Sequence, residues 1–363
     1  PFPAPRERVN SLMDGGRFGY SRTGTREACM RAIVISLALM GCTDKDGDTG
    51  GSDALNRPVL EAPDPSDGFQ LSMYGTAEPF SEVWMCSVYP LPVDAEGFTA
   101  VQSVEYNQNE GTHHFTVSAL NFGLLGGVTE SPVEYGTYDC NELYGDSTLM
   151  EEAVMVFGGQ GDPSGEMVFP DGTVANVPAN IDVLHEVHYV NPTPDPVDIY
   201  SEINAYTVAQ TAVEKSMWGG SVRDEHINIP PSGIHTEWSR CVFNEDVEVM
   251  VLAGHQHALG TRFDIAPYDG ETGEVGEVFF SNDDWHTPMI TQYEEPISVA
   301  AGQGFEWTCE WNNTTEEAVN YGNESTDEMC NMAVVFRPTE GTISLTAECE
   351  VVETSDGVLW DGS

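Results

Sequence analysis

Short strand-like runs, separated by turn residues, follow one another from about residue 69 onward and constrain the fold more than any other feature. The runs are rich in β-branched and aromatic residues, and clusters of Gly, Pro, Asn and Asp lie between them. Long amphipathic helical patterns are nearly absent, so we predict an all-β fold of antiparallel β-sandwiches or jelly rolls. The predicted strands include Glu82–Tyr89, His114–Leu120, Ile181–Val190, Ile199–Val208, Val247–Leu252, Val275–Phe280 and Met332–Phe336.

Two Pro-rich breaks interrupt the strand-like runs, one from Asn191 to Pro196 and one from Ile229 to Gly233. A chain of 363 residues is long enough for two domains of ordinary size. We therefore place a boundary near residue 210, with an N-terminal domain at residues 67–209 and a C-terminal domain at residues 210–353. Residues 354–363 form a tail in this interpretation.

The chain is strongly acidic, with 60 Asp and Glu residues against 13 Lys and Arg residues and a formal net charge of −47. A surface of this charge repels phosphate backbones, so we expect no nucleic-acid partner. Hydrophobic residues still make up 40% of the chain, which is enough to fill real cores and argues against a disordered protein. We interpret the acidic surface as a device for solubility.

The N-terminal region has the pattern of an export signal. Met30-Arg31 precede the apolar run Ala32–Met40, which is too short to span a bilayer as a helix. Leu39-Met40-Gly41-Cys42 resembles a bacterial lipobox, so residues 1–41 are expected to be an upstream extension and signal peptide, with a lipid on Cys42. A plain signal peptide is the alternative. Residues 42–66 predict a flexible acidic tether. We expect a secreted protein of the bacterial cell envelope, periplasmic or anchored in the outer membrane, which contacts the membrane only through its lipid.

Eight cysteines are spread along the chain and none forms a C-x-x-C pair, which argues against zinc-knuckle and thioredoxin-type motifs. Six of them lie in the strand-like region, as structural disulfides of an oxidising compartment do. These six are Cys86, Cys140, Cys241, Cys309, Cys330 and Cys349.

Histidines form two short motifs. His255 and His257 follow the apolar strand Val247–Leu252, and residues i and i+2 of a strand project from one face, so both imidazoles can bind one metal. A pair of surface histidines is the alternative. His113 and His114 are adjacent, and adjacent strand residues point to opposite faces. Both can therefore bind one metal only where the backbone twists or bulges.

His185 and His188 lie in one predicted strand, where alternation places them on opposite faces. His188 shares its face with Glu186, and His185 shares the other with Tyr189. One of the two histidines is therefore expected to be a ligand, and not both.

Met329 follows the acidic pair Asp327-Glu328 and precedes Cys330. A single methionine usually fills space in a core. Beside a His-x-His motif its thioether would instead be a soft ligand, which favours reduced copper over zinc or magnesium.

Taken together, these motifs resemble the copper type II ascorbate-dependent monooxygenases, the family of peptidylglycine α-hydroxylating monooxygenase and dopamine β-monooxygenase. The matching elements occur in the family's order and span roughly residues 69–353. They are His113-His114, Glu186-Val187-His188-Tyr189, His255-Gln256-His257-Ala258-Leu259-Gly260 and Asp327-Glu328-Met329-Cys330.

The resemblance implies two jelly-roll-like antiparallel β-sandwich domains, each carrying one copper ion. The cofactors would be two copper ions with ascorbate or another one-electron reductant, and O2 would be the co-substrate. The implied ligands are His113, His114 and His188 for an electron-supplying copper, and His255, His257 and Met329, the expected catalytic residues, for the copper that binds O2. The implied disulfides are Cys86–Cys140, Cys241–Cys349 and Cys309–Cys330.

The chain differs from peptidylglycine α-hydroxylating monooxygenase in the pocket that binds the carboxylate of that enzyme's substrate. The positions of that enzyme's Arg and Tyr look like Ala253 and Ala333 here, which cannot bind a carboxylate, whereas Asn331 matches a polar group of the pocket. We therefore expect that a peptide with a C-terminal glycine is not the substrate. We expect a monomeric enzyme that hydroxylates a C–H bond of another small molecule. A non-catalytic copper-binding lipoprotein of the periplasm or cell surface is the alternative.

Overall fold

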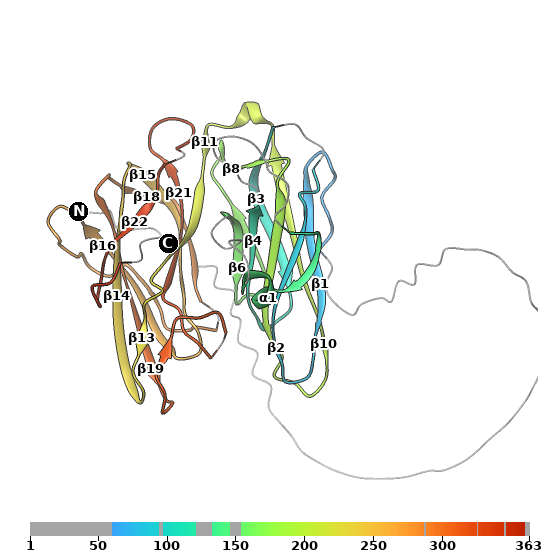
Figure 1. The fold of residues 1–363 in the computed structure, drawn as a ribbon. Helices are drawn as coiled ribbons and strands as arrows, with labels where there is room; N and C mark the ends of the chain where they lie inside the picture. Colours follow the sequence, from blue (N-terminus) through green and yellow to red (C-terminus); the bar gives the residue numbers. More distant parts are fainter. Residues whose placement is uncertain are drawn as a thin grey trace, which may run out of the picture. The chain divides into compact units, whose positions relative to one another are not determined.

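The computed structural model describes residues 60–93, 97–120, 133–145, 154–286, 288–324, 326–344 and 346–359. The expected signal peptide, Cys42 and the first part of the tether lie outside these residues. Within them the ordered elements are nearly all β-strands, which confirms the all-β prediction (Figure 1). The described part of the chain contains no helix that is long and apolar enough to cross a membrane.

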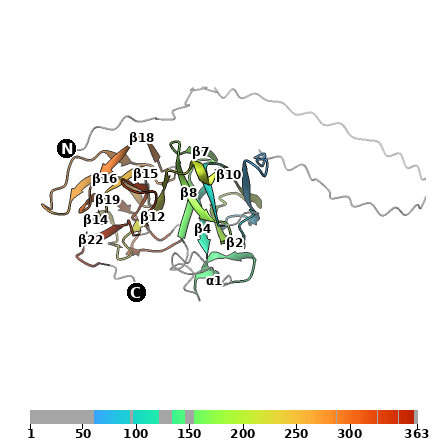
Figure 2. The ribbon, with the colours of Figure 1, turned by 90° about the horizontal axis from the view of Figure 1, so that it is seen from above.

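The first half of the described chain forms a sandwich of two antiparallel sheets. A short helix, α1 (Cys140–Gly145), lies beside one of these sheets, next to β2 (Glu82–Pro90) (Figure 2). One sheet has the order β1 (Gly68–Ala77), β10 (Val197–Val208), β3 (Phe98–Gln108) and β8 (Thr173–Pro178), with β7 (Ser164–Val168) paired to β3 and β11 (Lys215–Ser216) parallel to β8. The other has the order β5 (Gly136–Asp139), β2 (Glu82–Pro90), β9 (Asp182–Val190), β4 (Thr112–Leu120) and β6 (Val154–Gln160).

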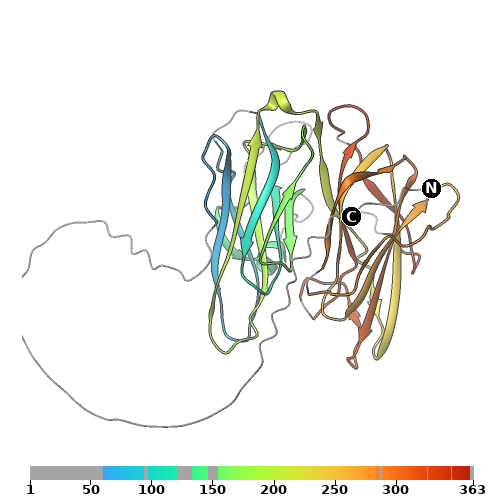
Figure 3. The same cartoon turned by 180° about the vertical axis from the view of Figure 1, so that it is seen from behind.

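The second half, drawn in yellow to red, forms another pair of antiparallel sheets (Figure 3). One sheet has the order β12 (Trp218–Arg223), β21 (Asn331–Pro338), β15 (Val247–His255) and β18 (Ile290–Val299). The other has the order β17 (Phe280–Asn282), β16 (Gly260–Asp269), β19 (Gln303–Asn313), β14 (Gly233–Phe243) and β22 (Cys349–Thr354). The short strands β13 (Asn228–Ile229) and β20 (Val319–Asn320) pair with each other, and the 3-10 turn η1 (Gln210–Ala212) precedes β11.

The two halves share one strand order. β1-β10-β3-β8 of the first half corresponds to β12-β21-β15-β18 of the second, and β2-β9-β4-β6 corresponds to β14-β19-β16-β17. Bulges also recur at the same place, because the register shifts between Thr112 and His114 in β4 and between Gly260 and Arg262 in β16. The halves are thus two versions of one jelly-roll-like sandwich.

A matching corner fixes the correspondence residue by residue. After β9, the amide of Asn191 donates to the backbone oxygens of Ala77 and Glu78, and Thr193 donates its backbone N–H and its hydroxyl to the Asn191 side chain. After β19, Asn313 and Thr315 make the same contacts in the second half, with Ile229 and Pro230 as the backbone acceptors. Asn191 therefore corresponds to Asn313, which places His188 at the position of Glu310.

Each sandwich has its own apolar core, and strand β15 contributes buried residues to both. Val249 and Leu252 of β15 pack in the second core, whereas Met250 and Val251 pack in the first. The register of β15 shifts between Val249 and Val251, and this bulge turns two successive side chains toward one side. Met250 is 1% exposed, so the contact between the halves is dry at this point.

One predicted strand is wrong. Val275–Phe280 contains only an isolated bridge between Val275 and Tyr268, and β17 begins at Phe280. This segment runs beside β16 near Pro267, where Gly276 donates to the Pro267 oxygen at 2.8 Å. Because proline has no N–H, it cannot return the hydrogen bond, and a regular ladder does not form.

Candidate metal centre

The three histidines expected in the first half meet on one face of the β4–β9 pair. Because the register shifts between Thr112 and His114, His113 is an extra residue in β4. Such a bulge lets adjacent side chains turn to the same side, which is the condition that the His113-His114 motif requires. His114 lies opposite His188, and the three ring centroids are 5.2, 5.3 and 5.4 Å apart.

Strand alternation separates His185 from His188, as the sequence predicts. His185 is completely buried and is bonded through Nδ1 to the Tyr89 hydroxyl at 3.0 Å and through Nε2 to the Ser201 hydroxyl at 2.9 Å. Burial lowers the pKa of His185 to about 3. Both of its ring nitrogens are occupied, so His185 is a structural residue. The ring of His188 instead faces His113 and His114, and its Nε2–H donates to Oε1 of Glu82 at 2.6 Å.

The histidines of the second half lie at the end of β15 and in the turn that follows. His255 is the last residue of β15, and the turn to β16 closes with Gly260 donating to the His257 backbone oxygen at 2.9 Å. The two ring centroids are 5.2 Å apart. The Nδ1–H of His257 donates to the backbone oxygen of Asp327 at 3.2 Å, so its Nε2 keeps the lone pair.

Glu328 stabilises this turn by accepting hydrogen bonds from its backbone. Its carboxylate accepts the backbone N–H groups of His257 at 2.9 Å and Leu259 at 2.6 Å, and the indole N–H of Trp311 at 2.9 Å. Burial raises the pKa of Glu328 to about 7, although these donors oppose the shift. The residue before Met329 thus fixes the backbone on either side of Ala258.

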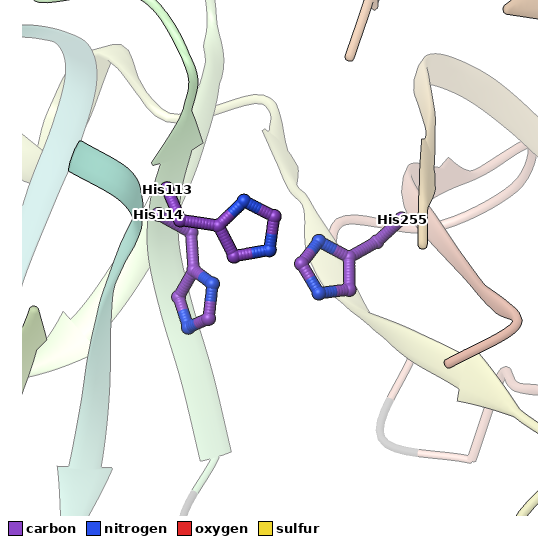
Figure 4. Close-up of side chains that lie close together, drawn as sticks. All are labelled: His113, His114 and His255. Atoms are coloured by element: carbon purple, nitrogen blue, oxygen red, sulfur yellow. The ribbon is translucent and has the colours of Figure 1, made fainter. Parts of the chain in front are cut away.

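Histidines from both halves form a single cluster. The ring centroid of His113 lies 4.8 Å from that of His255 and 5.3 Å from that of His257. One nitrogen each from His113, His114 and His255 lie within 4.8 Å of one another, and Figure 4 shows the rings of His113 and His255 turned toward each other. Gln160, at the end of β6, accepts the Nδ1–H of His255 at 3.0 Å. The indole of Trp285 borders the cluster, 5.9 Å from His113 between ring centroids.

Five buried imidazole nitrogens of the cluster have no hydrogen-bond partner among the described residues. Leaving a buried polar atom unpaired costs about 1–3 kcal/mol. Burial, together with the neighbouring histidines, lowers the pKa of His113, His114 and His255 well below the usual value, and lowers that of His257 to about 4. Neutral imidazoles with unused lone pairs fit a transition-metal ion such as copper. The five atoms are Nδ1 and Nε2 of His113, Nδ1 of His114, Nδ1 of His188 and Nε2 of His257.

The remaining candidates lie where β21 begins. Asn331 is opposite His255 in the β15–β21 register, and Ala333, two residues later in β21, is opposite Ala253, two residues earlier in β15. Met329 is buried, and its sulfur accepts the Asn331 amide at 3.3 Å. Met329 thus contacts Asn331, the residue across from His255 in the strand register, and the two alanines present no charged group to a ligand.

All three implied disulfides are present. Cys86–Cys140 joins β2 to α1, and Cys241–Cys349 joins β14 to β22. The third joins β19 to the residue that follows Met329, since Cys309 is bonded to Cys330. Glu186 lies close to the first pair, but those sulfurs are bonded to each other and cannot bind a metal as thiolates.

Three residues that hold the histidines were not expected from the sequence: Glu82, Gln160 and Glu328. Glu328 adjoins Met329 in the matched motif, so its position could have revealed it. Glu82 and Gln160 carry no such signal, because they reach His188 and His255 across 106 and 95 positions of the chain.

Comparison with known proteins gives one family match. The model of the copper type II ascorbate-dependent monooxygenase C-terminal domain matches residues 218–352. No curated protein matches the sequence. Among solved structures, coconut allergen cocosin is 6% identical with a TM-score of 0.15, and covers 78% of this chain and 79% of its own. The infectious bursal disease virus VP2 subviral particle is 10% identical with a TM-score of 0.16, and covers 78% of this chain and 75% of its own.

The matched segment contains His255, His257, Met329 and both disulfides of the second half. It therefore supports the family assignment made from the motifs, and residues 218–352 are a C-terminal domain of the copper type II ascorbate-dependent monooxygenase family.

Proposed function

We propose that this chain is a two-copper monooxygenase that hydroxylates a C–H bond of a small organic molecule, using O2 and ascorbate or another one-electron reductant. The observation that carries the proposal is the group of five buried imidazole nitrogens without a partner, gathered from four of the six expected ligands. Buried polar atoms are rarely left without partners in a folded protein, and a bound metal ion would give these nitrogens theirs.

Two sets of residues would hold the copper ions. His113, His114 and His188 would hold the electron-supplying ion through three neutral imidazoles. His255, His257 and Met329 would hold the other, where the thioether favours the reduced state. Bound copper would supply one-electron transfer and the binding of O2, which these ligands suit.

The protein's own residues prepare these ligands by fixing their tautomers. Glu82 accepts the Nε2–H of His188, Gln160 accepts the Nδ1–H of His255, and the Asp327 backbone oxygen accepts the Nδ1–H of His257. In each ring the other nitrogen is thereby left with its lone pair. Acceptors of this kind orient imidazole ligands in metal sites generally.

The surroundings of Asn331 support a substrate without a carboxylate. Ala253 and Ala333 face each other across β15 and β21 and offer neither charge nor hydrogen bond. Asn331 is buried, and its Oδ1 has no partner among the described residues, so it can accept one hydrogen bond from a substrate N–H or O–H. A small neutral molecule with one donor group fits these residues better than an anion.

Secretion and lipid anchoring at Cys42 remain part of this proposal. Three disulfides are typical of a protein that folds in an oxidising compartment. We further propose that the enzyme acts as a monomer, attached to the cell envelope through residues 42–66.

Copper content tests the proposal directly. The wild-type chain, loaded anaerobically with Cu(I), should retain two copper ions, and His188→Ala and Met329→Ala should each lose one. His188→Ala should keep copper at the second site and lose ascorbate-driven oxygen consumption. One copper ion or none in the wild type would contradict the proposal. Two copper ions without oxygen consumption on any substrate of a broad neutral panel would favour a copper-binding lipoprotein.

A further inference from the structure

Glu82 lies within hydrogen-bond distance of His188 and can fix the tautomer of its ring. Glu82 begins β2, and in the β2–β9 register Trp84 lies opposite His188, so Glu82 is the diagonal neighbour of His188 on the same face. The Nε2–H of His188 donates to Oε1 of Glu82 at 2.6 Å. A carboxylate can only accept, so the ring proton is held on Nε2 and the lone pair on Nδ1. This Nδ1 is one of the buried atoms without a partner among the described residues.

The turn before Glu82 has the same backbone conformation in both halves of the protein. Phe80 has a φ of 52° and donates its backbone N–H to Thr193, and in the second half Ser232 has a φ of 62° and donates to Thr315. Left-handed backbone is costly for residues other than glycine, yet both halves adopt it at this point. The left-handed backbone is therefore a feature of the sandwich fold, since it also occurs in the half that lacks a histidine at this place.

The carboxylate, in contrast, occurs only in the half that has the histidine. The corresponding residue of the second half is Ile234, which is exposed, and the position of His188 is taken by Glu310. The shared fold thus tolerates an isoleucine at this place. An acidic residue at Glu82 is explained by its contact with His188 and not by the needs of the strand.

We propose that Glu82 is a positioning residue of the first copper site, which orients His188 and makes its Nδ1 a stronger electron donor. A carboxylate bonded to the far nitrogen increases the basicity of an imidazole ligand. A more basic ligand stabilises Cu(II) relative to Cu(I) and lowers the reduction potential of the ion that it binds. Glu82 thereby makes the first copper a better electron donor. This inference rests on the two-copper function proposed above.

Two variants separate orientation from charge. Glu82→Gln keeps an oxygen that can accept the Nε2–H but removes the negative charge, and Glu82→Ala removes both. The full-length protein is loaded with copper, and the reduction potential is followed by the Cu(II) electron paramagnetic resonance signal. The measurement is repeated in a His257→Ala, Met329→Ala background, which isolates the first site. Cu(II) affinity is measured by competition with a chelator.

We expect Glu82→Gln to raise the reduction potential of the first site while copper remains bound. Glu82→Ala should also weaken Cu(II) binding there by about 10- to 100-fold. The control is Glu237→Gln, because Glu237 accepts the Nε2–H of His235 at 2.7 Å, a similar pair outside the cluster. The control should change neither the potential nor the affinity.

Unchanged potential and affinity in both Glu82 variants, with two copper ions bound to the wild type, would overturn this inference and leave the monooxygenase proposal intact. An equal shift in Glu237→Gln would also overturn it, because the effect would then be general. A wild-type chain that binds no copper at the first site would overturn both proposals together.

Discussion

The side chain of Gln160 joins β6 of the first half to His255 of the second. Its Oε1 accepts the Nδ1–H of His255 at 3.0 Å, and its Nε2 donates to the Gly254 backbone oxygen at 2.9 Å. Gln160 also lies opposite His114 in the β4–β6 register. One amide therefore links β6, the neighbour of the strand that carries His114, to the ring of a second-half histidine.

We predict that Gln160→Leu weakens the second copper site. The substitution keeps the volume but removes both hydrogen bonds and leaves the Gly254 oxygen without its donor, which should cost about 1–3 kcal/mol of unfolding free energy. The His255 ring loses its fixed tautomer, so Cu(I) affinity at that site should fall by about tenfold. Denaturant unfolding and chelator competition measure the two effects. Gln102→Leu, which loses only an exposed contact to Asp171, should change neither.

Glu328→Gln should loosen the turn that carries His257. The amide replaces one acceptor oxygen with an NH2 group, which would face a backbone N–H or the Trp311 indole N–H. We expect a loss of about 2–3 kcal/mol in unfolding free energy and of copper from the second site only. Circular dichroism during unfolding and metal analysis test this. The exposed Glu316→Gln serves as the control, and equal copper retention in the two variants would count against a role for Glu328 in holding His257.

The disulfide between Cys309 and Cys330 should matter locally as well as globally. It closes a separation of 21 residues, for which chain entropy predicts about 3 kcal/mol. Because Cys330 follows Met329, the double variant Cys309→Ala, Cys330→Ala should also lose copper from the second site. The double variant Cys86→Ala, Cys140→Ala should be destabilised yet keep that copper. If both double variants retain the second copper equally, the disulfide does not position Met329.

The β fold and the histidines that gather in the cluster could be predicted from the sequence more easily than the residues that support these histidines. The alternation of His185 and His188 follows from strand period alone, and the His113-His114 pair required a bulge that the structure contains. The pairings of Glu82 and Gln160 depend on which strands become neighbours and in what register, and no local pattern encodes this. The orientation of Met250 was equally hidden, because one extra residue in β15 reverses the side on which it packs.

The buried, neutral state of His185 should make the unfolding free energy fall as the pH is lowered. Its pKa is about 3 in the folded chain against about 6.5 when unfolded, because burial disfavours the charged ring. Above pH 6.5 both states are neutral and its contribution to stability is fully present. As the pH falls toward 3, the unfolded chain takes up the proton first, so stability is lost by on the order of 1.4 kcal/mol per pH unit. His185→Gln has no proton to gain, and the unfolding free energy of the metal-free variant should fall less steeply between pH 6.5 and 4 than that of the wild type. Parallel curves for the two proteins would show that His185 is not the buried neutral group described here.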